Sequence, residues 1–154
     1  MHHHGYLWVG DKARFDQEGI RRPAPADPAP GCDPDVVRRH RQAAAEFRVS
    51  EVPPVETAHW LLKPAGLVRG TWEEPKEAAA WLEGQLVQYA PRYDSLHERE
   101  PVRIAFLVAS AAARLTWGGD VSTGVYLSRP QFLCLALVTC SPNLSSPTLS
   151  CPAP

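Results

Sequence analysis

The chain has 154 residues, of which 44% are hydrophobic, and its 16 lysines and arginines nearly balance its 17 aspartates and glutamates. This length predicts a single domain, 1–154, large enough to bury a hydrophobic core without disulfides or metal ions. The charge balance excludes a strong overall attraction to nucleic acid or to an anionic membrane surface, so nucleic acid is not predicted as a partner.

Nothing in the sequence predicts association with a membrane. No apolar run reaches the roughly 18 residues that a transmembrane helix needs. The beginning of the sequence lacks the basic, apolar and small-residue regions of a secretory signal, so we predict a cytoplasmic protein. The histidines of the opening MHHHG are either native or the remnant of a tag, and the sequence leaves both alternatives open.

The first third of the chain predicts a strand, a connector and a helix. GYLWVG alternates between faces and predicts a strand over 5–9. Four prolines in 21–33 predict an extended connector, because proline lacks the N–H that helices and sheets need. Asp33 and Pro34 are typical of a helix start, and the helix is expected over 34–48. Its expected apolar face consists of Val36, Val37, His40, Ala44 and Phe47.

Two more helices are predicted in the middle of the chain. Residues 75–90 carry an apolar stripe at helical spacing and a proline in the first turn. Residues 101–117, PVRIAFLVASAAARLTW, are apolar in nearly every direction and are followed by two glycines, which typically end a helix. Because a helix that is apolar all round is usually buried, we expect 101–117 to be the central helix of the core.

The last third of the chain leaves one assignment open. Residues 121–127 alternate and are rich in β-branched side chains, so they predict a strand. Residues 131–140, QFLCLALVTC, are almost continuously apolar and fit either a buried strand or a helix, with the strand favoured. A second helix layer or a homodimer is expected to cover the remaining apolar face of this segment. Residues 141–154 predict an irregular tail.

These elements predict a mainly helical α+β domain packed on a small antiparallel sheet. The sheet is expected to consist of 5–9, 121–127 and 131–139. If 131–140 is a helix instead, the alternative is an all-α fold.

Three of the four cysteines lie near the end of the sequence. Cys134 is most simply a buried core residue. Cys140 and Cys151 are a candidate disulfide, because a bond across ten intervening residues would fasten the tail to the sheet. The expected reducing compartment disfavours this bond. No paired C-x₂₋₄-C spacing occurs, so no metal site and no cofactor are predicted.

A polar stripe on helix 101–117 is the candidate ligand site. Arg103, Ser110 and Arg114 fall on one line of an otherwise apolar helix, and two guanidinium groups can bind a carboxylate or phosphate. His40 is added because a histidine on an apolar helix face can titrate near neutrality. The alternative is a solvated helix edge paired with neighbouring acids. No catalytic residue is assigned.

The segment GGDVSTGVYLSRPQFLCLALVTCSPN, with CP further on, resembles small uncharacterised proteins of high-GC actinobacteria. The resemblance covers the last quarter of the chain and implies no activity. For function, the sequence favours a binding or interaction module that acts through a partner protein or as a homodimer. The alternative is a protein or enzyme that binds an anionic small molecule at the polar stripe, and whether the chain is an enzyme stays open.

Overall fold

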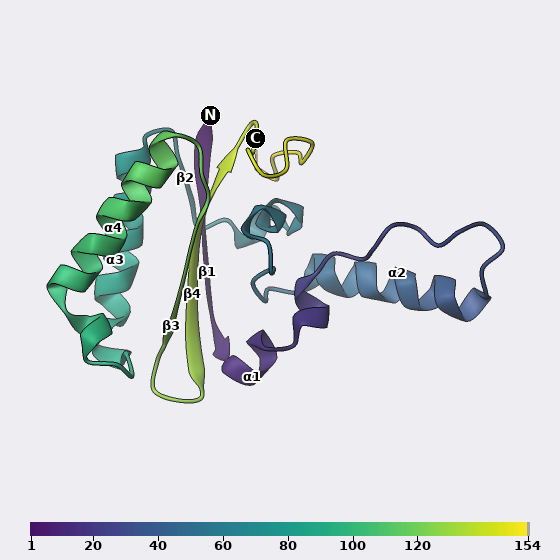
Figure 1. Cartoon of the computed structure of the whole chain (residues 1–154), viewed down its shortest axis with the longest axis horizontal. Coiled ribbons are helices and arrows are strands. Elements are labelled where there is room, and N and C mark those ends of the chain that lie inside the picture. Colours follow the sequence, from purple (N-terminus) through teal and green to yellow (C-terminus); the bar gives the residue numbers. More distant parts are fainter. Residues whose placement is uncertain (154) are drawn as a thin grey trace.

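The computed structural model describes residues 1–153, and it contains a mainly helical α+β fold around one antiparallel sheet (Figure 1). The sheet has four strands in the order β2-β1-β4-β3. The strands are β1 His2–Asp11, β2 Gly70–Trp72, β3 Val121–Tyr126 and β4 Gln131–Cys140. The predicted fold class is confirmed. The all-α alternative is wrong, because 131–140 forms a strand.

The first strand is longer than the predicted 5–9 and includes the three histidines. All ten residues of β1 pair with β4, from His2 opposite Cys140 to Asp11 opposite Gln131. On its other edge, β1 pairs with the short strand β2, which the sequence analysis missed. The histidines therefore lie inside the sheet ladder rather than ahead of it.

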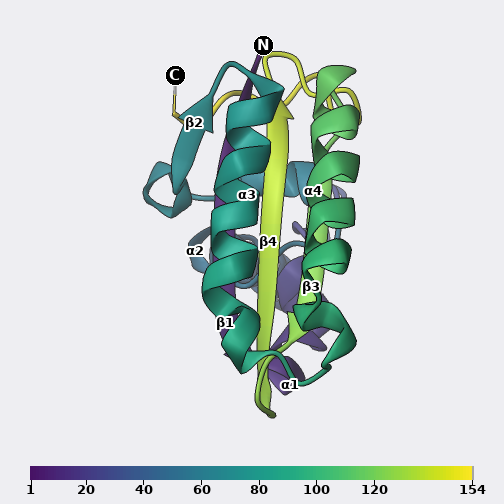
Figure 2. The ribbon, with the colours of Figure 1, turned by 90° about the vertical axis from the view of Figure 1, so that its left-hand side faces the viewer.

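Helices α3 (Pro75–Tyr89) and α4 (Pro101–Thr116) cover one face of the sheet side by side (Figure 2). Each helix buries one stripe against the inward leucines of β4. This cluster contains Leu82, Leu86, Ile104, Leu115, Leu133, Leu135 and Leu137. The predicted helix positions are correct to within a residue or two.

The predicted burial of the fourth helix is wrong. α4 lies in the outer layer, with Val102 80% exposed and both Phe106 and Trp117 61% exposed. The helix needs only one apolar stripe to cover the sheet, and its opposite side faces outward. On that outward side the guanidinium carbon of Arg103 lies 6.0 Å from the centre of the Phe106 ring.

The opposite face of the sheet is covered by irregular segments of the same chain. These are the 3₁₀ helices Thr57–Leu62 and Ala65–Leu67 and the segment 141–153, which has no helix or strand. Trp60 stacks on Tyr6 there, with ring centroids 4.6 Å apart. Both faces of β4 are therefore buried within one chain. A second layer, rather than a homodimer, covers the segment 131–140.

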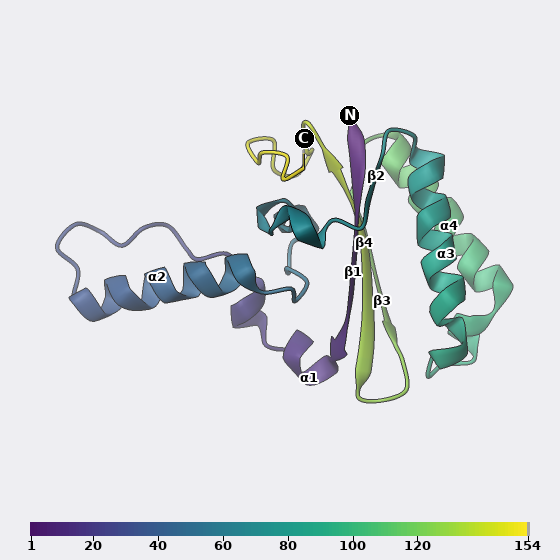
Figure 3. The same ribbon diagram turned by 180° about the vertical axis from the view of Figure 1, so that it is seen from behind.

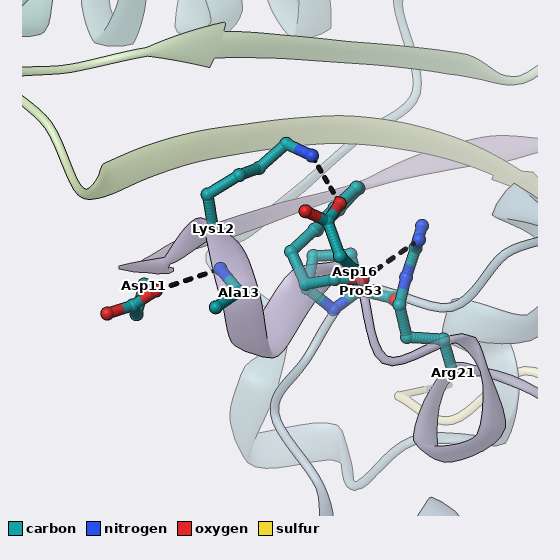
Figure 4. A network of polar contacts seen from close by, with 7 residues as sticks. Asp11, Lys12, Ala13, Asp16, Arg21 and Pro53 are labelled. Carbon is teal, nitrogen blue, oxygen red and sulfur yellow. Dashed lines mark hydrogen bonds and ion pairs between the residues drawn. The ribbon is translucent and has the colours of Figure 1, made fainter.

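Beyond β1 the chain turns sharply through two short helices (Figure 4). The Asp11 carboxylate accepts a 2.8 Å hydrogen bond from Ala13 N–H and so caps α1 (Lys12–Phe15). Arg21 ends the 3₁₀ helix Glu18–Arg21, and its Nε donates to the Pro53 carbonyl at 2.8 Å. These contacts tie the end of β1 to the segment that precedes Thr57.

Helix α2 (Pro34–Val49) projects from the body as an arm (Figure 3). As predicted, Asp33 caps it by accepting from Asp35 N–H at 2.8 Å, and Pro34 lies in the first turn. Of the predicted apolar face, Phe47 is fully buried, Val37, His40 and Ala44 are half-buried, and Val36 is exposed. Residues 22–33, most of the predicted connector, form an irregular strand-free path along the arm.

Two 3₁₀ helices, Ala90–Arg92 and His97–Arg99, connect α3 to α4. Among the described residues, no helix is both long enough and apolar enough to cross a membrane. Pro154, the last residue of the predicted tail, lies outside the described residues.

Candidate metal centre

Two histidines and two cysteines from distant parts of the sequence meet at one end of the sheet. His2 and His4 are two residues apart on β1, so their side chains lie on the same face. Cys140 is the last residue of β4 and lies directly opposite His2. Cys151 belongs to the final irregular segment, which lies next to the start of β1 (Figure 1).

The four donor atoms are close enough to share one ion. All of them lie within 4.8 Å of one another. His2 Nε2 is 3.1 Å from His4 Nε2. Cys151 Sγ is 3.3 Å from His4 Nε2 and 3.4 Å from His2 Nε2.

These separations resemble the edges of a tetrahedral zinc site. Zinc binds nitrogen at about 2.0–2.1 Å and sulfur at about 2.3 Å, which gives ligand–ligand edges of about 3.3–3.8 Å. The three distances above lie at or just below this range.

Burial keeps His4 in the form that binds metals. His4 and Cys140 are fully buried, whereas His2 and Cys151 are half-buried. Burial, together with the neighbouring His2, lowers the pKa of His4 to about 4, so its imidazole is neutral at pH 7. Burial raises the pKa of the Cys140 thiol. A metal ion bound here would have to displace thiol protons.

A hydroxyl on the neighbouring strand orients one of the imidazoles. His4 Nδ1 lies 2.8 Å from Thr71 Oγ1 on β2. When Nδ1 carries the proton and donates to this hydroxyl, Nε2 keeps its lone pair free and points it at the cluster. The three-residue strand β2 thus contributes an outer contact that many zinc-binding histidines have.

The path of the final segment is fixed by a buried asparagine. Asn143 Nδ2 donates to both carboxylate oxygens of Asp120 at 3.0 Å and to the Thr139 carbonyl at 2.8 Å. Its side-chain oxygen accepts from the backbone N–H groups of Ser145 and Ser146, at 3.0 Å each. Further along, Leu149 and Cys151 pack against the same apolar cluster as Tyr6. These contacts of the final segment therefore hold Cys151 next to the other three donor residues.

A buried phenol lies beside the cluster without a hydrogen-bond partner. Tyr6 follows His4 on the same face of β1, and no residue in 1–153 accepts from or donates to its hydroxyl. Burial raises the Tyr6 pKa, and the thiols of Cys140 and Cys151 raise it further. Because a buried unpaired hydroxyl is costly, a thiolate acceptor nearby would lower that cost.

His3 is the internal contrast to the two cluster histidines. Its side chain lies on the opposite face of β1, where Nδ1 is 3.0 Å from Thr139 Oγ1. It shares the burial and the lowered pKa of His4 but none of the thiol contacts. His3 is therefore the matched control for a substitution at His4.

The candidate disulfide partners are both free thiols in this structure. Their sulfurs lie within 4.8 Å of each other, in the same cluster as the two histidines. Cys134 is a buried thiol on β4 and lies outside this cluster, as expected for a core residue.

The sequence analysis predicted no metal site because it searched for closely spaced cysteines. The cluster instead draws its ligands from positions 2, 4, 140 and 151. Two histidines at i and i+2 on a strand were the available signal, since that spacing puts both on one face. Their pairing with the far end of the chain depends on β1 lying antiparallel to β4, which no local pattern reveals.

The four residues predicted as a ligand site do not come together. His40 lies on the α2 arm, on the other side of the sheet from α4 (Figure 1), and its Nε2 is 2.7 Å from the Pro25 carbonyl. Arg103 Nε donates to the Glu98 carboxylate at 3.3 Å. These two residues therefore bond to nearby groups of the protein, as expected if they do not form a ligand site.

Ser110 and Arg114 do share a hollow between α4 and β3, with a volume of about 340 Å³. Thr57, Ser122 and Thr123 also line it, together with the acidic residue Asp120. Within residues 1–153, the Arg114 guanidinium forms no hydrogen bond or ion pair, and its central carbon lies 5.7 Å from the centre of the Trp117 ring. This part of the predicted stripe is available to a ligand.

A scan against protein-family models and searches of curated proteins and solved structures gave no match. The resemblance of 118–143 to actinobacterial proteins therefore stays a prediction.

Proposed function

We propose that this chain is a zinc-binding protein in which one ion, held by His2, His4, Cys140 and Cys151, fastens the final segment to the first strand. The observation that supports this most directly is the convergence of four donor atoms within 4.8 Å. Four protein ligands leave no open position for water or substrate, which is typical of a structural site. The ion would contribute to folding rather than to a reaction.

The chemistry of the ligands favours zinc over other common ions. Thiolates are soft ligands that select zinc, copper(I) or iron–sulfur clusters, whereas calcium and magnesium prefer oxygen. Two sulfur and two nitrogen donors in a tetrahedral arrangement match zinc. Free thiols are needed for this site, which is why we also propose a reducing, cytoplasmic location.

The test is metal binding by the reduced full-length protein. We expect native mass spectrometry to show one zinc ion per chain, and cobalt(II) to give the visible absorption of a tetrahedral site with two sulfur ligands. Cys151→Ser and His4→Gln should lose most of this binding.

Cys134→Ser and His3→Gln are the matched controls, because each removes a buried side chain of the same kind outside the cluster. Both should still bind one ion if circular dichroism shows that they fold. Absence of a bound ion in the reduced wild-type protein, or equal binding by His4→Gln and His3→Gln, would contradict the proposal.

A second candidate function is protein interaction through the exposed side of α4. Val102, Phe106 and Trp117 lie at helical spacing there, and each is more than half exposed. A homodimer through this surface should dissociate in Phe106→Glu, as measured by light scattering over a range of concentrations. A wild-type protein that stays monomeric at all concentrations would contradict the homodimer.

The Arg114 hollow favours the small-molecule alternative. An unpaired guanidinium beside several hydroxyls suits a carboxylate or phosphate on a small polar molecule. Isothermal titration with citrate or inorganic phosphate should show binding that Arg114→Gln abolishes and that Arg103→Gln leaves unchanged.

A further inference from the structure

We propose that a peroxide oxidant joins Cys140 and Cys151 in a disulfide and thereby expels the zinc ion, so that the centre is a reversible redox switch. This inference rests on the proposed zinc site and concerns how zinc binding is regulated. It starts from the geometry of the cluster, in which the two sulfurs lie within 4.8 Å of each other.

The two cysteines differ in how they are held. Cys140 ends β4 and is fixed by its pairing with His2. Cys151 lies in a segment without helix or strand, so its sulfur can move the short distance needed for bonding. A disulfide brings sulfurs to about 2.05 Å. The required movement is therefore confined to the irregular segment.

They also differ in exposure, which sets the order of the reaction. Cys151 is half-buried, whereas Cys140 is fully buried. An oxidant arriving from solvent therefore meets the Cys151 sulfur first. The buried Cys140 sulfur is then in place to act as the resolving thiol.

The chemistry balances with hydrogen peroxide as the oxidant. The Cys151 thiolate attacks one peroxide oxygen, the O–O bond breaks, and a sulfenic acid and a hydroxide ion form. The Cys140 thiolate then attacks the sulfenic sulfur, which forms the S–S bond and releases a second hydroxide. Two protons from solvent convert the hydroxides to water, and the two electrons removed from sulfur have reduced the peroxide.

Oxidation would remove half of the ligand set. The disulfide sulfurs are no longer thiolates, and the thiolate is the form that binds a metal. Only the imidazoles of His2 and His4 remain, so the affinity for zinc should collapse. The final segment would stay fastened to β4 by the covalent bond instead of by the ion.

The pairing should be specific because the other two cysteines are remote. Cys134 lies on β4 six residues before Cys140, about 20 Å along the strand. Cys32 lies at the end of the arm formed by the connector and α2. Substituting either of these residues removes a thiol without touching the switch.

The experiment treats the zinc-loaded, reduced, full-length protein with hydrogen peroxide. A chromogenic zinc chelator follows release of the ion, and mass spectrometry of proteolytic peptides identifies the disulfide. We expect one zinc ion released for each Cys140–Cys151 disulfide formed, with full reversal by dithiothreitol and added zinc. Cys32→Ser and Cys134→Ser should behave like the wild type, and Cys151→Ser should form no intramolecular disulfide.

The failures of the two proposals can be told apart. If the reduced protein holds no zinc before peroxide is added, the proposed zinc site is wrong, and so is the proposed link between disulfide formation and zinc release. If zinc is bound but stays bound, or leaves while the sulfurs become sulfinic acids or pair with Cys32, the zinc site survives and the switch is overturned.

Discussion

Lys63 is a buried cation that forms no ion pair with an acidic group in residues 1–153. It is 2% exposed, its Nζ donates to the Phe47 carbonyl at 2.6 Å, and it lies 3.8 Å from the centre of the Phe47 ring. Phe47 is in the last turn of α2, where unpaired carbonyls attract a positive charge. Burial lowers the Lys63 pKa to about 8. The ammonium group thus joins the arm to the body at a cost in desolvation.

This cost predicts an alkaline rise in stability. Because the pKa is lower in the folded than in the unfolded state, the folded protein binds fewer protons between pH 8 and 10.5. The free energy of unfolding should therefore rise with pH across this window, by up to about 3 kcal/mol from this group. Urea denaturation of the wild type and of Lys63→Met, at several pH values, measures the difference. If the free energy of unfolding changed equally with pH in the two proteins, the desolvation cost assigned to Lys63 would be contradicted.

At the scale of residues, the sequence showed the kind of side chain but not its partner. Cys134 was predicted as a core residue because free cysteines are often buried, and it is buried. His40 was placed on the correct helix, but its partner, the Pro25 carbonyl, was not predictable because it comes from the connector that runs beside the helix. The cluster histidines were visible as an alternating pair. Their thiol partners lie more than 130 positions away, Cys140 at the end of β4 and Cys151 in the irregular segment that follows.

At the scale of elements, α4 shows why an apolar helix need not be central. Its inward stripe includes Leu115, which is fully buried, and its outward side includes Phe106, which is 61% exposed. Leu115→Ala should therefore lower the free energy of unfolding by about 2–5 kcal/mol. Phe106→Ala should change it by less than about 1 kcal/mol. Urea denaturation of both variants would contradict the outer-layer position of α4 if the two losses were equal.

The α2 arm predicts a local opening. Phe47 is its single fully buried residue, so Phe47→Ala should release the arm while the sheet stays folded. Hydrogen exchange followed by mass spectrometry should show faster exchange in 34–49 than in the wild type. Exchange in α3 serves as the control, because this helix packs on the other face of the sheet. A uniform increase in all helices would mean that α2 is part of one cooperative unit.

The sequence predicted the elements with strong local signals and missed the shortest strand. Helix starts at Pro34, Pro75 and Pro101 were recognisable because proline suits the first turn. Strand β2 has three residues, Gly70–Trp72, which is too short for any alternation to be seen. It exists because β1 offers a free edge. That edge also supplies the Thr71 hydroxyl next to His4.

At the scale of the whole molecule, the cluster joins the two ends of the described chain. β1 and β4 are neighbours in the middle of the sheet, and the segment 141–153 turns back over the face that carries His2 and His4. Such a long-range closure stabilises a fold because it restricts the unfolded chain more strongly than a local contact does. An ion at this point would close a loop of nearly the full length of the protein.

Zinc should accordingly stabilise the whole domain and not only its tail. At a free zinc concentration one hundred times the dissociation constant, the free energy of unfolding should rise by about 2.7 kcal/mol, provided that the unfolded chain does not bind the ion. Urea denaturation in zinc buffers, with and without a chelator, measures this rise. Cys134→Ser should show the same rise, and Cys140→Ser should show none. Tight binding without any rise would mean that the unfolded chain binds zinc equally well, and the ion would then have no role as a fastener.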